Sequence, residues 1–591
     1  MKPLTRLKNI LIKHQLDAFI ILKCDMFFSE EVLPHQERLK YITNFSGSSG
    51  FAVILSKSGQ KSAIFSDGRY KIQIENEVNK KDFNFFTGGL LSIQEFITFN
   101  KKNIKNIGID SSLISIRDFE LLTNNLNNKN INLIKIKENL VDIVWLNKPD
   151  IPKNNIYNLP IKYSGKKSLT KISELLKQIN NFNSKAYFLS QPDSLSWLLN
   201  IRDNQLKYSP VFRAFAIIKN NGKIIIFTEE NFNSDFFDKH KHIKIYNYRD
   251  LPKILKTFSK TCITLDPTMT SVKVFDLLKK NNIQVKFVDC PILKSKSIKN
   301  IKEQNNIKNI HVNDGLAFLK LWHWFETKKS NQILTEEDVS NKLYYFRSLN
   351  KTFKGNSFAT ICAYGKNGAI IHYKFKESKS RKINGKNLLL IDSGGQYLNG
   401  TTDVTRTLIK GDPSDEMKNF YTYVLKGHLA LSNLIFPMGI KGCDIDSIAR
   451  VYLWKHQEDY AHGTGHGVGN FLNVHEGPIS ISRRNMSNFY PGMIISNEPG
   501  YYKKNKYGIR IENLELVKKI HPTNKNMKFL KFETLTMVPY ENKLIKKCLL
   551  TLEEIKQIND YHKLVYSNIS KLLKTEESNL KKFLIKKTSK L

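Results

Sequence analysis

The sequence predicts an α+β protein of several domains, with two similar amino-terminal α/β modules followed by a larger domain of mixed helices and strands. The chain of 591 residues is too long for one hydrophobic core, since a domain takes about 100 to 200 residues. Apolar residues make up 41% of the chain, which is enough material for packed domains. The apolar pattern changes near residue 303, from short strand-like runs to a long helical period.

The first two modules are read from two stretches of similar pattern. Residues 38–75 alternate short apolar runs with Gly/Ser and Asp-Gly turns, which predicts short strands. A second apolar block of the same kind occupies residues 185–231. Between them, residues 147–168 are rich in proline, asparagine, lysine and glycine, as is typical of a boundary. We therefore expect one domain at residues 1–155 and a second at residues 156–302.

A third domain is expected at residues 303–545. Apolar residues return at helical spacing from residue 307, and residues 414–435 and 444–457 also carry a helical period. The strands predicted in this domain are "KNLLLIDSGG", "TTDVTRTLI", "PGMIISNEPG" and "GIRIENLELV". Their order hints at an internal duplication. The lysine-rich residues 546–591 are expected to form a basic, helical extension or a frayed tail.

Charge and cysteine usage bear on the cellular setting. The net charge of +39 raises nucleic acid or an anionic membrane as a partner. The excess is almost all lysine, spread through every segment, so we interpret it as solvated faces and expect neither partner, with polyanion binding as the alternative. Six scattered cysteines without C-x-x-C spacing favour a reducing cytoplasm. Lys13 and His14 interrupt the apolar start, and no apolar run is long enough to cross a bilayer.

Four carboxylates stand at the ends of predicted strands. Asp392 closes the run "LLLI", and Asp403 follows eleven residues later, so a strand, a glycine turn and a returning strand bring them side by side. Glu498 and Glu512 repeat this arrangement at fourteen residues. For any one acid, a turn-forming role or an arginine partner is the alternative. Because unpaired buried acids are costly, each needs a counter-charge.

The available counter-charges do not match four acids. Only Arg406 and Arg510 lie near these carboxylates in the sequence. Two divalent cations would balance four negative charges, and oxygen ligands with one imidazole suit Mn²⁺ or a similar ion. Two such ions, about 3.5 to 4 Å apart, can hold a hydroxide for hydrolysis.

The segment "AHGTGHGVGNFLNVHEGP", residues 461–478, carries three histidines on a glycine-rich string. Four glycines inside a helix would cost roughly 4 kcal/mol, which predicts an extended loop. Extended backbone separates His462 and His466 by up to roughly 13 Å, so one of them ligates and its neighbours serve the substrate. We expect the glycines to let the backbone approach metals and substrate. His372, after an Asn-Gly turn, reads by itself as a structural histidine.

Two other motif families are excluded. "HEGP" lacks the second histidine of H-E-x-x-H, and Pro478 is incompatible with the helix which that motif needs. "GTGHGVG" does not match G-x-G-x-x-G, and no Gly-Lys-Ser/Thr follows as in a phosphate loop. Neither a zincin nor a nucleotide-binding protein fits.

Taken together, "GAIIHY", "IDSGGQYLNGTTDVTRT", "HGTGHGVGNFLNVHEGP", "SNEPGYY" and "GIRIEN" resemble aminopeptidase P, the Xaa-Pro aminopeptidase of the pita-bread metallopeptidases. "NFSGSSG" with "SDGRY", and "SLSWLLNIRDNQLKYSPVF", resemble the two creatinase-like domains of that family. The resemblance covers about residues 25–575. It implies two creatinase-like α/β domains, then a pita-bread catalytic domain, in a homodimer with two divalent ions per subunit.

The resemblance also implies a ligand set. Asp392 would bind one metal ion, Asp403 and Glu512 would bridge both, and His466 and Glu498 would hold the second. Glu498 would act in addition as the general acid and base. Mn²⁺ is the expected ion, with Co²⁺ and Zn²⁺ as alternatives.

The remaining site residues come from the same resemblance. His372, His462 and His475 match positions that orient the peptide and stabilise the tetrahedral intermediate or the leaving amine, with His372 and His475 in catalytic roles. Arg69, in "SDGRY", matches a substrate-contacting arginine. His466 and Glu498 would also border the substrate.

The expected activity is hydrolysis of the bond between an amino-terminal residue and a proline in second position. Prolidase and methionine aminopeptidase, which share the catalytic fold, are rivals, but two preceding modules favour aminopeptidase P. A catalytically inactive pita-bread protein that binds other partners is an alternative of another class. Intact residues at all five ligand positions weigh against it.

Overall fold

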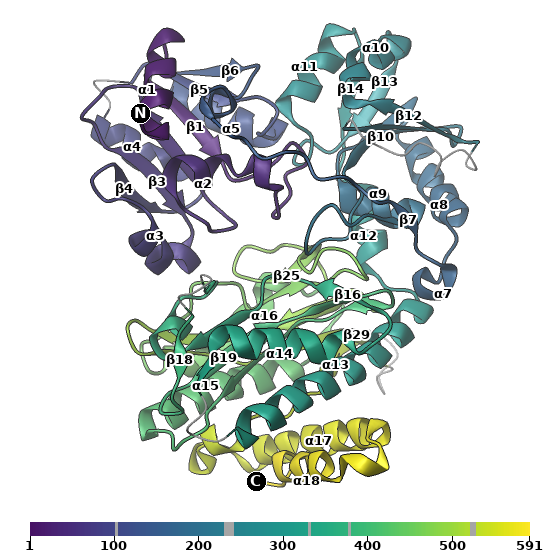
Figure 1. The fold of residues 1–591 in the computed structure, drawn as a ribbon. Coiled ribbons are helices and arrows are strands. Elements are labelled where there is room, and N and C mark those ends of the chain that lie inside the picture. Colours follow the sequence, from purple (N-terminus) through teal and green to yellow (C-terminus); the bar gives the residue numbers. More distant parts are fainter. Residues whose placement is uncertain (101–103, 230–240, 329–332, 376–379, 521–526) are drawn as a thin grey trace. The chain divides into compact units, whose positions relative to one another are not determined.

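The computed structural model describes residues 1–100, 104–229, 241–328, 333–375, 380–520 and 527–591 (Figure 1). These residues form two compact units. The first unit contains Met1–Asn158, Lys167–Leu206 and Val211–Ile292, and the second contains Leu159–Lys166, Lys207–Pro210 and Leu293–Leu591. Among the helices of the described ranges, none is long and apolar enough to cross a membrane.

The first unit opens with a six-stranded mixed sheet in the order β4-β3-β2-β1-β5-β6, covered by helices (Figure 1). The strands are β1 (Ala18–Leu22), β2 (Phe51–Leu55), β3 (Ser62–Ser66), β4 (Phe83–Thr87), β5 (Asn106–Asp110) and β6 (Asn132–Ile136). The helices are α1 (Pro3–Lys13), α2 (Arg38–Thr43), α3 (Lys71–Glu77), α4 (Ile93–Asn100), α5 (Ile116–Asn127) and α6 (Leu140–Val144). The prediction of strands throughout residues 38–75 is wrong at both ends, where α2 and α3 bury only part of their surface against the sheet.

The second module repeats this sheet in the order β12-β11-β10-β8-β13-β14, with the same sequence of parallel and antiparallel pairings. Its strands are β8 (Ala186–Leu189), β10 (Ala214–Lys219), β11 (Ile224–Thr228), β12 (Ile243–Asn247), β13 (Cys262–Leu265) and β14 (Gln284–Phe287). Its helices are α8 (Ser168–Asn181), α9 (Pro192–Leu199), α10 (Leu251–Leu255) and α11 (Val272–Lys280). Two short strands, β7 (Tyr157–Asn158) and β9 (Ile201–Arg202), pair with each other. The expectation of two similar α/β modules is confirmed.

Contacts between the two modules are buried. Arg213 of the second module donates to Asp25 of the first, with Nη2 and Oδ2 3.2 Å apart, and also to Gln36 Oε1 at 3.0 Å. The Phe27 and Phe215 rings lie 4.7 Å apart beside this pair. Phe27 and Ile116 of the first module belong to the apolar core cluster of the second, and the two modules form a single compact unit.

The second unit begins its long helical run with α13 (Ile301–Thr327), whose first turn is capped by the Asn300 side chain. It is followed by α14 (Glu336–Ser348). A first set of strands comprises β15 (Leu334–Thr335), β16 (Phe353–Asn356), β17 (Ile361–Tyr364), β18 (Lys382–Ile383), β19 (Leu389–Ser393), β20 (Gly395–Tyr397), β21 (Gly400–Thr401) and β22 (Val404–Leu408). Two helices, α15 (Asp415–Ser432) and α16 (Gly442–Trp454), follow where a helical period is predicted.

A second set of strands completes this unit. It comprises β23 (Ile435–Pro437), β24 (Gly465–Gly467), β25 (Glu476–Ile481), β26 (Ile494–Asn497), β27 (Gly500–Lys503), β28 (Tyr507–Arg510), β29 (Asn513–Ile520) and β30 (Phe529–Thr534). In both sets an outer strand pair, β19 with β22 and β26 with β29, encloses a small hairpin. The same arrangement thus occurs twice, which agrees with the predicted duplication.

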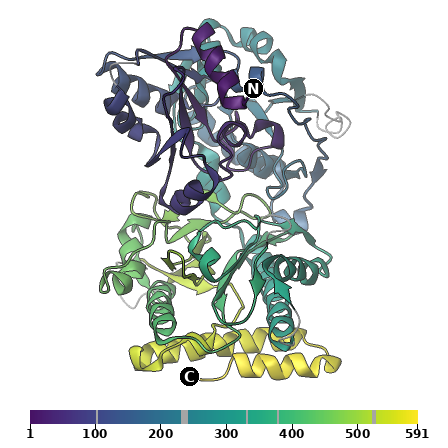
Figure 2. The same cartoon turned by 60° about the vertical axis from the view of Figure 1, so that its left-hand side comes forward.

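The chain ends in folded structure. Helices α17 (Leu552–Ile569) and α18 (Ser578–Lys587) lie together across the bottom of the view and pack against α13 (Figure 2). Leu580, Phe583 and Leu584 are buried in the same core as Trp322. The possibility of a frayed tail is wrong, because α18 contributes apolar side chains to the core.

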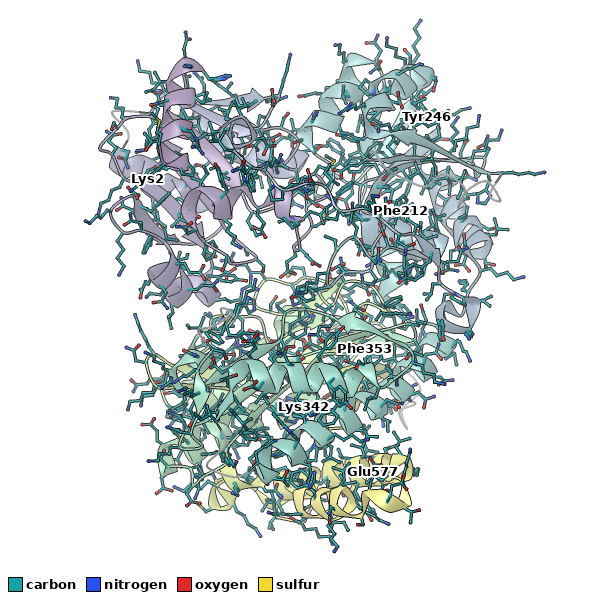
Figure 3. The ribbon with its side chains drawn as sticks, viewed as in Figure 1. Lys2, Phe212, Tyr246, Lys342, Phe353 and Glu577 are labelled. Atoms are coloured by element: carbon teal, nitrogen blue, oxygen red, sulfur yellow. The ribbon has the colours of Figure 1, made fainter. Side chains whose placement is uncertain are left out.

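The lysines have two settings. Most are exposed. Lys342 on α14 (Figure 3) is half-buried, and its ammonium nitrogen lies 4.5 Å from the centroid of the Tyr345 ring. Lys296 and Lys299 are instead buried on the Glu476 carboxylate. The interpretation of the charge as solvated faces therefore holds for most lysines but not for the buried ones, which among the described residues are Lys171, Lys296, Lys299 and Lys587.

Candidate metal centre

Two strand pairs deliver the four carboxylates. In the first pair, Asp392 on β19 lies opposite Thr405 on β22, and Asp403 comes directly before β22. In the second pair, Glu498 comes directly after β26 and Glu512 directly before β29. A bridge joins the two pairs, in which the Glu512 N–H donates to the Thr405 carbonyl at 3.1 Å. This bridge brings the two acidic pairs together.

Asp403, His466 and Glu512 form the tightest group. Each offers one ligand atom, and these atoms all lie within 4.8 Å of one another. His466 Nε2 is 3.5 Å from Asp403 Oδ2 and 3.5 Å from Glu498 Oε1. The His466 Nδ1–H donates to the Gly467 carbonyl at 3.0 Å, which leaves Nε2 as the ligating atom.

Asp392 completes the set of carboxylates and is held by an arginine side chain. The Arg510 Nη2 donates to Asp392 Oδ2 at 2.6 Å. The other oxygen, Asp392 Oδ1, is buried without a hydrogen-bond partner, and so is Asp403 Oδ1. Buried carboxylate oxygens without donors are costly unless a cation lies against them. These two orphaned oxygens therefore fit bound metal.

Arg406, the second candidate counter-charge, does not pair with an acid. Its guanidinium donates to the carbonyls of Pro539, Val538 and Glu512 and to Asn513 Oδ1. It thus supports the backbone on which Glu512 stands. Arg510 and His466 contact the acidic group directly.

The acids repel one another in this buried setting. Burial raises the pKa of Asp392 to about 7, opposed by Arg510 and reinforced by Asp403. Burial also raises the pKa of Glu512, and Asp403 and Asp392 raise it further. Burial lowers the pKa of His466, but Asp403 and Glu498 outweigh it and bring the value to about 9. Without metal, these raised pKa values mean that the site holds extra protons. Divalent cations could take the place of those protons, because metal binding releases them from the ligands.

The glycine-rich segment is extended, as predicted, with β24 at its centre. A Cβ at Gly465 would come 1.9 Å from the Ser496 carbonyl, and one at Gly467 2.2 Å from the Glu476 carbonyl. At these two glycines the backbone therefore approaches the neighbouring strands closely, and the approach to metals and substrate stays a prediction.

His462 belongs to a hydrogen-bonded chain that the sequence did not reveal. Its Nδ1–H donates to the Gly463 carbonyl at 2.8 Å, so Nε2 accepts from the Tyr502 hydroxyl at 2.8 Å. Arg510 Nη1 donates to the Tyr502 oxygen at 2.6 Å. His462 Nδ1 also lies 3.8 Å from Glu498 Oε2. The only sequence signal for Tyr502 is its position in "EPGYY", after Glu498.

The other predicted residues have different surroundings. The exposed His475 packs edge-on against the His466 ring, with centroids 4.4 Å apart. His372 follows the short helix η8 (Gly365–Ala369) and is half-buried. Arg69 belongs to the other compact unit, where it pairs with Asp67 at 2.7 Å. Its substrate contact remains a prediction.

The comparisons with known proteins agree with this site. Residues 305–519 match metallopeptidase family M24, and residues 528–591 match the C-terminal region of that peptidase family. Residues 3–143 and 147–303 each match a creatinase/prolidase N-terminal domain. These matches cover both sheet modules and the domain that carries the acidic cluster.

Several relatives match along the whole length. A probable Xaa-Pro aminopeptidase P of Laccaria bicolor is 37% identical, covering 97% of this chain and 90% of the relative. Xaa-Pro aminopeptidase 1 of Dictyostelium discoideum is 38% identical, covering 98% and 94%.

Solved structures of two kinds resemble this chain: one matches its full length, and others match only part of it and share the fold alone. The X-prolyl aminopeptidase of Caenorhabditis elegans, described as a cytosolic enzyme with a di-nuclear active site, has a TM-score of 0.93 and 28% identity over 100% of this chain and 99% of that one. The Xaa-Pro dipeptidase of Bacillus anthracis, at 21% identity and a TM-score of 0.50, covers 63% of this chain and 99% of its own, and shares only the fold. The chain therefore belongs to the Xaa-Pro aminopeptidase P family of the M24 metallopeptidases.

Proposed function

We propose that the chain is a metal-dependent aminopeptidase that releases the amino-terminal residue from peptides with proline in second position. The observation that carries the proposal is the convergence of Asp403, His466 and Glu512 within 4.8 Å, beside two buried carboxylate oxygens without donors. The full-length identity to Xaa-Pro aminopeptidases supports the substrate class.

The cofactor in this proposal is a pair of divalent ions, with manganese as the resident metal. Asp392, Asp403, His466, Glu498 and Glu512 would hold these ions, with Asp392 serving one ion, His466 and Glu498 the other, and Asp403 and Glu512 shared between the two. When bound, two such ions polarise a scissile carbonyl and lower the pKa of a water molecule. The di-nuclear site described for the C. elegans enzyme supports the number of ions.

We assign the proton transfer in this reaction to Glu498. Its Oε1 accepts from the Ser496 hydroxyl at 3.1 Å, and its backbone N–H donates to the Thr464 carbonyl at 2.8 Å. These bonds orient a half-buried carboxylate between His462 and His466. A carboxylate held in this way can take a proton from the attacking water and return it to the leaving nitrogen.

The histidines orient the peptide. Because Tyr502 donates to His462 Nε2, the His462 ring is fixed in one tautomer. His475 packs edge-on against His466, and His372 lies on a separate loop, after the short helix η8. We propose that these side chains and Arg69 bind the substrate and stabilise the charge that develops on the scissile carbonyl.

Two rival functions are weaker. The Xaa-Pro dipeptidase of Bacillus anthracis matches only 63% of this chain, which leaves a large part of it unexplained by that activity. An inactive binding protein would not need two buried, donor-free carboxylate oxygens beside a histidine.

The setting belongs to the proposal as well. We assign the protein to the cytoplasm, since the C. elegans enzyme is described as cytosolic, and expect a homodimer without a nucleic-acid partner. Titration of a labelled duplex at physiological salt should give no saturable binding, because contacts from scattered lysines weaken steeply with salt.

The test of the activity uses two peptides. Metal-loaded protein should release arginine from Arg-Pro-Pro but not from Arg-Ala-Ala, and chelation followed by dialysis should remove the activity. Equal rates on both peptides would point to a general aminopeptidase. If the protein bound two ions but cleaved neither peptide, the proposal would be contradicted.

A further inference from the structure

Glu336 is a fully buried carboxylate outside the metal centre. It is the first residue of α14, and its side chain is 0% exposed. Two backbone N–H groups, those of Tyr364 and Arg381, donate to it at 2.6 and 3.1 Å. The Asn367 amide and the Tyr373 hydroxyl also donate, at 2.9 and 2.8 Å. Each carboxylate oxygen therefore accepts two hydrogen bonds.

The four donors surround the segment that carries His372. Tyr364 is the last residue of β17, which pairs with the strand of Asp392, and the segment leaves the sheet at this point. Asn367 lies in the turn, and Tyr373 directly follows His372. The Asn367 amide also donates to the Tyr373 oxygen at 2.9 Å, so the donors are linked to one another.

The opposite face of this segment is fixed by backbone contact. A Cβ at Gly508, on β28, would come 1.8 Å from the Gly368 carbonyl, and one at Gly368 would come 2.8 Å from the Gly508 nitrogen. Strand β28 continues to Arg510, which holds Asp392. The His372 segment therefore lies between Glu336 and the strand that supports the metal centre.

We propose that Glu336 is a positioning residue that sets the location of His372 for catalysis. The inference rests on the proposed function, in which His372 contacts the substrate. Glu336 itself touches neither substrate nor metal ligand, and it acts through the Tyr373 hydroxyl and the backbone at Tyr364.

A carboxylate is the group that this position requires. Four donors converge on two oxygens, whereas a glutamine has one oxygen and an amide that is itself a donor. In Glu336→Gln the new amide must face either the Tyr364 N–H or the Arg381 N–H, so at least one buried donor is left unpaired. The segment should then shift while α14 stays folded.

The experiment compares Glu336→Gln with Glu337→Gln, which removes the same charge from the same helical turn. For Arg-Pro-Pro, Glu336→Gln should lower kcat/KM by roughly 10- to 100-fold, the range expected for a misplaced catalytic group. The loss should fall mainly on kcat, with unchanged metal stoichiometry. Glu337→Gln should behave as wild type.

A double-mutant cycle separates positioning from general destabilisation. In a His372→Ala background, Glu336→Gln should add less than about a twofold loss, because the residue it positions is already absent. The same factor of loss in both backgrounds, or wild-type activity of Glu336→Gln, would overturn the inference.

Hydrogen exchange gives a readout that does not depend on turnover. In Glu336→Gln, amides of residues 365–375 should exchange faster than in wild type, while those of α14 and β19 should not. Unchanged exchange over 365–375 would contradict the anchoring role even if the wild-type protein cleaved no Xaa-Pro peptide. Faster exchange with an inactive wild type would instead place the failure on the proposed function.

Discussion

Asp403 illustrates why the acidic cluster needs cations. Its Oδ1 is buried without a donor, and its Oδ2 lies 3.5 Å from His466 Nε2. Removing a carboxylate from water costs several kcal/mol, which hydrogen bonds or opposite charges must offset. With Glu512 inside the same group, the protein alone supplies too little positive charge.

We predict that Asp403→Ala removes both metal and activity. Loss of a proposed bridging ligand should leave at most one ion bound and lower kcat/KM for Arg-Pro-Pro by at least about 1,000-fold, since metal stabilisation of the transition state amounts to several kcal/mol. Metal analysis of the purified variant and steady-state kinetics measure the two effects.

The matched control is Asp415→Ala. Asp415 is an exposed acid in the first turn of α15, and its side chain is 83% exposed. It should retain wild-type metal content and rate. Full turnover by Asp403→Ala with one ion or none would refute the ligand assignment.

Lys587 explains why the C-terminal helix is part of the fold. Its ammonium is buried between the carboxylates of Glu326 and Glu541, and the ammonium nitrogen lies 4.2 Å from the centroid of the Trp322 ring. Burying these charges costs free energy, and removing the lysine would leave the acids without a counter-charge, so the fold depends on this residue once the acids are in place. Helix α18 is thereby attached to α13 by one charged contact inside an apolar cluster.

Replacing this lysine should loosen the C-terminal helix. In Lys587→Met, the buried Glu541 and the half-buried Glu326 lose their cation, and the unfolding free energy should fall by about 3 to 5 kcal/mol. Limited proteolysis should then cleave near α18 before other sites. Lys586→Met, at an exposed position of the same turn, is the control and should change the unfolding free energy by less than about 0.5 kcal/mol. Equal resistance of both variants to proteolysis would argue against the role.

A buried histidine on α17 should make stability depend on pH. Burial lowers the pKa of His562 to about 4, with Arg406 adding to the effect, and its Nε2 accepts from the Tyr540 N–H at 3.2 Å. Because the folded-state pKa lies below the unfolded value of 6.5, this contribution is present above about pH 6.5 and is lost as pH falls toward 4.

The expected loss over that window is about 3 kcal/mol, at 1.36 kcal/mol per pKa unit. Denaturant unfolding at pH 7 and pH 4.5 should show a smaller difference for His562→Gln than for wild type. Other groups titrate in the same range, so the comparison between the two proteins isolates His562. Identical pH dependence in both would exclude this contribution.

At the scale of the whole molecule, the two amino-terminal modules are repeats that share a buried contact. Ser115 and Ser271 occupy equivalent places, each capping a helix, and they form a bridge with each other. The Arg213–Asp25 pair lies in the same contact between modules. Repeated sheets alone would not make one compact unit without this interface.

The stability of this interface should depend on the buried Arg213–Asp25 ion pair and much less on the exposed Lys135–Asp276 pair. Arg213→Met leaves Asp25 without its cation and should lower the unfolding free energy of the first unit by about 3 to 5 kcal/mol. Lys135→Met breaks the exposed Lys135–Asp276 pair across the same interface and should cost at most about 1 kcal/mol. Thermal unfolding of both variants measures the difference, and equal losses would contradict the assignment.

Local spacing predicted a large part of the site. Eleven residues between Asp392 and Asp403 suffice for two strands and a turn, so their adjacency follows from the local chain. The glycines between His462 and His466 excluded a helix for the same kind of reason. The prediction failed for residues 38–43 and 71–77, where short helices lie between strands and apolar residues are too few to reveal a period.

By itself, the sequence determined the repeated modules, the ends of the acidic strands and the extended histidine loop, because each depends on neighbours in the chain. Only the tertiary structure decided which distant groups meet, such as Arg510 with Asp392 or Glu336 with the segment of His372. Many arginines and acids could satisfy such a pairing, and local patterns do not distinguish them. Packing selects the partners, since a buried charge is stable only beside the groups that the fold places against it.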